Sequence, residues 1–63
     1  MLKDNLTKYR TQQGLSKLRL SKISGVSRET IKQIEVDGRQ EVLITTLEKL
    51  AKALNITVNE LIK

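Results

Sequence analysis

The chain contains no cysteine, histidine, proline, tryptophan or phenylalanine, and one tyrosine is its only aromatic residue. Without cysteine, no disulfide or thiolate metal site can stabilise the fold, and without histidine a zinc site would need carboxylates alone. We therefore expect no metal and no cofactor. The absence of proline and the presence of only three glycines fit an all-helical fold built from the 24 apolar residues, mostly Leu, Ile and Val.

Long hydrophobic runs are also missing. No apolar stretch approaches the length that spans a membrane, and no signal peptide opens the chain. A chain of 63 residues buries only about 60% of its unfolded surface. We expect one soluble, cytoplasmic domain over residues 1–63, without a membrane partner. An enzyme is not expected, because the chain has no nucleophile–base pair, no phosphate-binding glycine loop and no carboxylate cluster.

The net charge of +5 is unevenly distributed along the chain. Residues 1–32 hold eight Lys/Arg and two Asp/Glu, a balance of +6, whereas residues 33–63 hold four and five, a balance of −1. A basic surface on one side is typical of proteins that bind polyanions. On charge alone, a lysine-rich surface that only keeps the protein soluble explains the bias equally well.

Five helical segments are predicted from apolar periodicity and capping signals. The first covers about residues 2–13 and ends at Gly14, and Ser16 and Ser27 are the expected N-caps of the second and third. The fourth and fifth are expected to open at two capping boxes, Thr45-x-x-Glu48 and Thr57-x-x-Glu60.

The segment at about 17–36, KLRLSKISGVSRETIKQIEV, is the most informative part of the sequence. Two short helical patterns meet at Gly25, and glycine permits a positive φ at no steric cost. Val26, Ile31 and Ile34 then pack the second helix back onto the first. This spacing resembles the helix-turn-helix of the Cro and repressor-type (XRE) family of DNA-binding domains.

The resemblance covers nearly the whole chain: GLS at 14–16, LSKISGVSRETIKQIE at 20–35 and LEKLAKALNITVNELI at 47–62 all look like segments of that family. It implies an all-α, compact five-helix bundle of the lambda-repressor-like type, with the helix-turn-helix at helices two and three. It also implies sequence-specific binding of double-stranded DNA, with the third helix in the major groove.

The third helix carries the candidate base-contacting residues. On a 3.6-residue wheel, Ile31 and Ile34 define its core side, and the polar residues lie on the other side. Arginine can bond guanine and glutamine can bond adenine in bidentate fashion, while glutamate accepts from cytosine N4. By resemblance, the first two residues of this helix and the one four or five further on usually read bases. The predicted base-contacting residues are Arg28, Glu29, Thr30, Lys32 and Gln33. Taken alone, the same residues are an ordinary solvated helix face.

A second set is predicted to contact phosphate. The N-terminus of the second helix offers free backbone N–H groups and the positive end of the helix dipole. The family commonly has Gln at position 17, whereas Lys17 keeps a donor and adds a charge. The loop after the third helix is one residue longer and more acidic than is usual in the family. The predicted phosphate-contacting residues are Ser16, Lys17, Ser27, Arg39 and Gln40.

The resemblance also implies a structural ion pair between Arg10 and Glu35, which would tie the first helix to the end of the third. Both residues lie at the edge of an apolar face on their helical wheels. Arg10 is therefore expected to stabilise the fold rather than to contact DNA.

The leading interpretation is a transcriptional repressor that binds a palindromic operator as a homodimer. Two alternatives remain open. One is the antitoxin of a toxin–antitoxin pair, in which Leu18 or the run Val42-Leu43-Ile44 contacts the toxin, and the other is a protein-interaction bundle without DNA binding. Core packing is the other interpretation of these three apolar residues, and it is expected more for Ile44 than for Leu43. The chain ends just after the fifth helix, which leaves open whether it is a fragment of a longer repressor.

Overall fold

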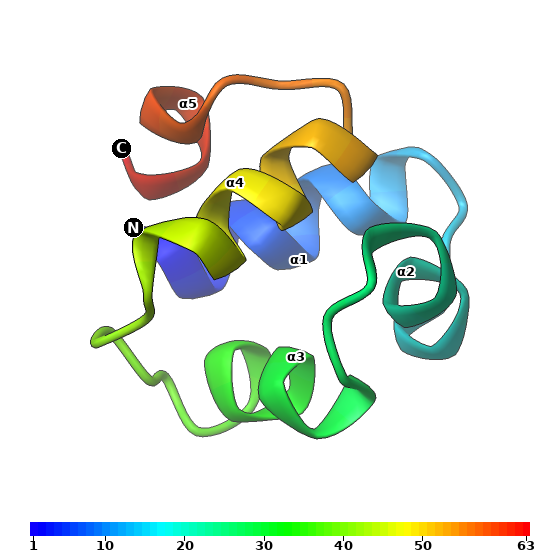
Figure 1. The fold of residues 1–63 in the computed structure, drawn as a ribbon, viewed down its shortest axis with the longest axis horizontal. Coiled ribbons are helices and arrows are strands. Elements are labelled where there is room, and N and C mark those ends of the chain that lie inside the picture. The colour runs from blue at the N-terminus through cyan, green and yellow to red at the C-terminus, as the bar shows by residue number, and fades with distance from the viewer.

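The computed structural model describes all residues, 1–63, and consists of five helices without strands (Figure 1). The helices are α1 (Leu2–Gln12), α2 (Lys17–Ser24), α3 (Arg28–Glu35), α4 (Ile44–Ala53) and α5 (Val58–Ile62). α1 packs against α3 and α5, α2 packs against α3 and α4, and α4 packs against α5. The predicted all-α, five-helix architecture is confirmed. No helix combines the length and the apolar character that crossing a membrane requires.

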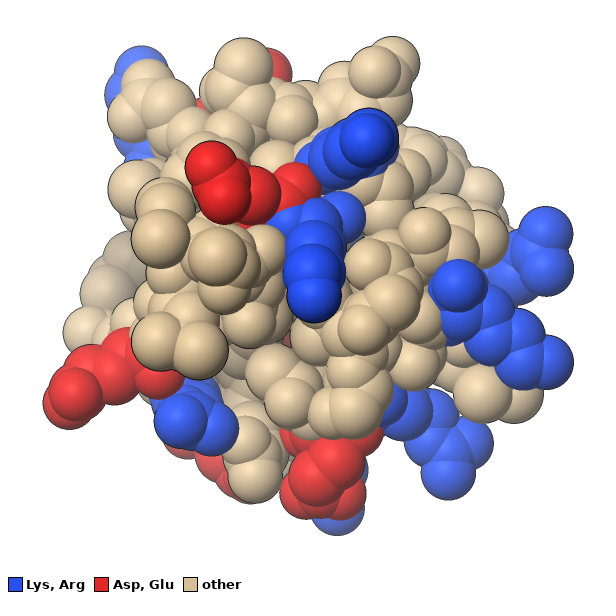
Figure 2. All heavy atoms as spheres, viewed as in Figure 1, with Lys and Arg blue, Asp and Glu red and all other residues tan.

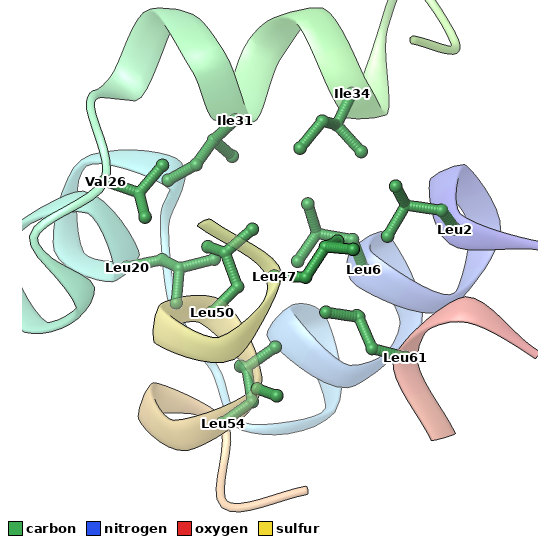
Figure 3. Close-up of a cluster of buried hydrophobic side chains, with 11 residues drawn as sticks. Leu2, Leu6, Leu20, Val26, Ile31, Ile34, Leu47, Leu50, Leu54 and Leu61 are labelled. Atoms are coloured by element: carbon green, nitrogen blue, oxygen red, sulfur yellow. The ribbon is translucent and has the colours of Figure 1, made fainter. Parts of the chain in front are cut away.

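All five helices contribute to one core of buried apolar side chains (Figure 3). Leu6, Leu20, Ile31, Ile34, Leu50, Leu54 and Leu61 are almost completely enclosed. Burying each such side chain stabilises the fold by about 1.5–3 kcal/mol. Because the cluster joins every helix, α2 and α3 are held in one orientation by contacts with the rest of the bundle.

The turn between α2 and α3 depends on Gly25, whose φ of 78° lies in the left-handed region. Its backbone N–H donates to the carbonyl oxygen of Ser21 at 3.0 Å, which closes the last turn of α2. The space that a Cβ would occupy there is open. The requirement for glycine is therefore conformational, because an L-residue with a side chain is strained at this φ whatever the room around it.

We expect Gly25→Ala to lower the free energy of unfolding by about 1–2 kcal/mol, the cost of placing an L-alanine in the left-handed region. Gly25→Asn is the matched variant, because asparagine tolerates that region better and its loss should be smaller. Urea unfolding followed by circular dichroism measures both. An alanine variant as stable as the original chain would show that the turn has another backbone conformation.

The predicted capping box at the start of α5 is confirmed. The hydroxyl of Thr57 accepts from the backbone N–H of Glu60 at 3.0 Å, and the Glu60 carboxylate accepts from the backbone N–H of Thr57 at 2.9 Å. These hydrogen bonds from Thr57, backbone first and then side chain, lower the pKa of Glu60 below its usual value of 4.5. The box starts a helix of only five residues, whose Leu61 side chain is buried.

Two expectations about the start of α4 are wrong. The helix begins at Ile44 with Leu43 as its N-cap and no side-chain cap, so Thr45 and Glu48 do not form a capping box. Ile44 is 59% exposed instead of packing in the core. The reason is tertiary: Val42 packs against the core, and with Leu43 as the N-cap the helix begins one residue before Thr45.

Candidate nucleic-acid interface

α3 has one face fixed in the core and the other free in solvent. Ile31 and Ile34 are both 0% exposed and hold the helix against the bundle. Among the five predicted base-contacting residues, Arg28, Glu29 and Lys32 are exposed, and Thr30 and Gln33 are half-buried. The helix therefore presents polar side chains from a rigid support, which is what reading base edges requires.

Serine hydroxyls cap the N-termini of both α2 and α3, as the sequence predicts. Ser16 Oγ accepts from the backbone N–H of Arg19 at 3.0 Å, and Ser27 Oγ accepts from that of Thr30 at 3.1 Å. Ser27 Oγ also lies 2.8 Å from the Thr30 hydroxyl, so these two side chains hydrogen-bond each other. Lys17, the first residue of α2, is half-buried beside its cap.

Gln33 is held by a residue from the loop that follows α3. Arg39 Nη1 donates to Gln33 Oε1 at 2.7 Å, and the Arg39 backbone N–H donates to the Gln33 carbonyl oxygen at 3.0 Å. Arg39 Nε donates to the carbonyl oxygen of Glu41 at 3.1 Å. Arg39 therefore lies beside the outer face of α3, where one predicted base contact and one predicted phosphate contact come together.

The basic side chains gather beside this face. In Figure 2, Lys and Arg stand out along the side where Figure 1 shows α2. The sequence of α2, KLRLSKIS, contains three basic residues and no acidic one. α3 holds two basic and two acidic residues, and one of the acids, Glu35, is buried. Positive charge is therefore densest along α2, which packs against α3, and this suits a phosphate backbone lying there.

The family described as Helix-turn-helix matches residues 6–61. The chain belongs to this family. It is a helix-turn-helix protein of the Cro and repressor type, a DNA-binding regulator of transcription, and α2 and α3 are the two helices of the motif. No curated protein and no solved structure matches the chain significantly.

One predicted phosphate contact lies apart from the rest of the helix-turn-helix surface. Gln40 lines surface hollows together with Met1 and Leu2, at the N-terminal end of α1. Its neighbour Arg39 reaches in the other direction, to Gln33 on α3. The two residues that the sequence placed side by side as phosphate contacts are thus directed to different parts of the surface.

Arg10 and Glu35 lie together under the helix-turn-helix. Arg10 Nε and Nη2 donate to the two carboxylate oxygens of Glu35, both at 2.8 Å, and the side chains are 12% and 3% exposed. The hydrogen bond to Glu35 raises the pKa of Arg10 above its usual value, burial opposes the rise, and the Glu35 charge adds to it. The pair joins α1 to the last residue of α3.

Two further groups complete this ion pair, and the sequence did not indicate them. Thr7 Oγ1 donates to Glu35 at 3.0 Å, and Arg10 Nη1 donates to the carbonyl oxygen of Leu15 at 2.6 Å. No buried side-chain nitrogen or oxygen in the chain lacks a hydrogen-bond partner. Thr7 could have been found from its spacing to Arg10. The two residues are one helical turn apart, so their side chains lie on the same face of α1, and a partner of Arg10 is within reach of Thr7 as well.

Proposed function

We propose that the protein is a repressor that binds a two-fold symmetric operator as a homodimer, with α3 in the major groove. The observation that carries the proposal is the solvent-facing set Arg28, Glu29 and Lys32 on a helix whose opposite face is completely buried. A helix held in this way presents its side chains to base edges without a further loss of backbone conformational freedom. Contacts to bases would supply selectivity, and contacts to phosphates would supply most of the affinity.

The start of α2 supports a role in positioning the protein on DNA. The cap of Ser16 leaves other N–H groups of the first turn of α2 without a partner, and Lys17 adds a positive charge there. An anion at this end of a helix is favoured by both the N–H groups and the helix dipole. A phosphate held there would fix how α3 enters the groove.

An exposed apolar corner supports the proposed homodimer. Met1, Leu43, Ile44 and Ile62 are between 47% and 74% exposed. Figure 1 shows the N-terminus, the start of α4 and the end of α5 close together, and Met1 and Ile62 line one hollow. A second copy packed against this corner would cover side chains that are costly to leave in water.

The experiment that tests the proposal is selection from a random duplex library, followed by binding of the selected sequence at several salt concentrations. We expect a two-fold symmetric consensus with half-sites about one helical turn apart. Enrichment of a single half-site would contradict the homodimer. Weak, steeply salt-dependent binding without enrichment of any sequence would contradict sequence-specific binding to an operator.

Two variants separate the proposed roles of α2 and α3. Lys17→Ala should weaken binding to every sequence and reduce the salt slope by about one, because one phosphate contact is lost. Arg28→Ala should instead relax the preference at one base position, by about 1–3 kcal/mol. Binding of both variants to the selected duplex and to single-site mutants of it measures the difference. If Lys17→Ala changed the base preference and left the salt slope unchanged, the assignment of Lys17 to a phosphate contact would be wrong.

A further inference from the structure

We infer that Arg39 is a positioning residue for base recognition, because it fixes which end of the Gln33 side-chain amide faces the DNA. The inference rests on the proposed function, in which the outer face of α3 reads bases. It goes beyond that proposal by assigning the base preference at one position to a residue outside α3. The sequence indicated only a phosphate contact for Arg39.

The chemistry of the two groups determines the orientation of the amide. A guanidinium carries five N–H donors and no acceptor, so only an acceptor atom can face it. Gln33 Oε1 therefore lies toward Arg39, at 2.7 Å from Nη1. Gln33 Nε2 donates to no atom of the protein and keeps both of its N–H donors for a ligand. Rotating the amide by half a turn would set its NH₂ group against the guanidinium, donor against donor.

Arg39 is itself held in place. Its Nε donates to the carbonyl oxygen of Glu41, and its backbone N–H donates to the carbonyl oxygen of Gln33. The second of these bonds occupies a carbonyl at the end of α3 that has no partner within the helix. A cation is also favoured near this end by the helix dipole. The backbone and the side chain of Arg39 therefore engage the same glutamine, and the guanidinium is fixed before DNA arrives.

A fixed amide orientation has a consequence for base preference. In the major groove, guanine offers the acceptors O6 and N7, adenine offers N7 and thymine offers O4, whereas cytosine offers only its N4 amino donor. A free glutamine can turn its oxygen toward cytosine N4. With Oε1 turned toward Arg39, Gln33 presents its N–H donors to the groove and does not form the bidentate pair with adenine N6 and N7. Cytosine, which offers no acceptor there, is the base most strongly disfavoured at the contacted position.

The test begins by locating that position. The base pair whose preference is lost in Gln33→Ala identifies it within the selected duplex. Binding of the four possible base pairs there is then measured for the original chain, Arg39→Gln and Arg39→Lys. We expect the original chain to bind the cytosine duplex roughly tenfold more weakly than the best one. In Arg39→Gln we expect the cytosine duplex to bind only about threefold more weakly than the best duplex, or less. A glutamine at position 39 can face either end of the Gln33 amide, because it can donate or accept.

In Arg39→Lys we expect most of the roughly tenfold difference to remain, because lysine, like arginine, is only a donor.

Arg19→Gln is the matched control, since Arg19 is an exposed arginine of α2 whose side chain has no hydrogen-bond partner. It should leave the ratios among the four duplexes unchanged. Equal weakening of all four duplexes by Arg39→Gln would overturn the inference and leave Arg39 as a phosphate contact only. An original chain that selects no sequence would overturn the proposed function as well, so the two failures are distinguishable. Equal thermal unfolding of all variants excludes a folding defect.

Discussion

Glu35→Ala is expected to destabilise the protein by about 3–5 kcal/mol, the usual cost of leaving one charge of a buried pair without its partner. The carboxylate accepts from Arg10 through both oxygens and from Thr7, and it is 3% exposed. Its removal would leave the Arg10 guanidinium buried with the Leu15 carbonyl as its remaining partner. At about 0.05–0.15 kcal/mol per residue, a chain of 63 residues has a free energy of unfolding of roughly 3–9 kcal/mol, so this loss removes a large share of its stability.

Urea unfolding followed by circular dichroism measures the loss, with Asp37→Ala as the control. Asp37 is an exposed acid two residues further on, and its replacement should change the stability by no more than about 0.5 kcal/mol. The double variant Arg10→Met with Glu35→Leu should recover part of the loss, because it removes both buried charges together. Equal stability of the Glu35 and Asp37 variants would mean that the pair contributes nothing to the fold.

Leu50→Ala is expected to lower the free energy of unfolding by about 2–5 kcal/mol. Leu50 is a residue of α4, is 0% exposed and belongs to the buried cluster, where it lies next to Leu20 of α2 (Figure 3). Truncating it removes buried methyl groups and leaves a cavity that the short helices around it can close only partly. Because Leu50 is buried, a loss of DNA binding in this variant would result from unfolding and not from the loss of a contact between Leu50 and DNA.

Leu43→Ala is the matched control, because it makes the same chemical change at a side chain that is 74% exposed. Its effect on the stability of the monomer should stay within about 0.5 kcal/mol. Denaturant midpoints at low protein concentration, where self-association is negligible, compare the two variants. A Leu43 variant as destabilised as the Leu50 variant would contradict the exposed position of Leu43 at the start of α4.

Much of the fold was predictable because its signals are local. The caps at Ser16, Ser27 and Thr57 each act on a backbone N–H three residues later, so the sequence around them is sufficient. Gly25 was identifiable for the same reason, since a positive φ is a property of one residue. Thr45 has the sequence of an N-cap too, but it does not cap α4. Val42 packs against the core, and the helix begins at Ile44, one residue before Thr45.

For the candidate site, the sequence indicated which residue types would face outward from α3, and the periodicity of Ile31 and Ile34 was enough for that. It did not indicate how those side chains are connected. The bond between Gln33 and Arg39 crosses a turn whose path depends on how the chain leaves α3. Gln40, the next residue, has no comparable link to α3 and faces the start of α1.

By itself, the sequence determined that this is a five-helix protein with a helix-turn-helix, because periodicity, caps and the glycine turn act within a few residues. The family resemblance implied the pair of Arg10 and Glu35, but only the tertiary structure decided that Thr7 joins it and how the Gln33 amide is oriented. Thr7 and Glu35 are 28 positions apart in the chain, and no spacing rule reaches so far. Their meeting depends on how α1 packs on α3, which the whole core fixes at once.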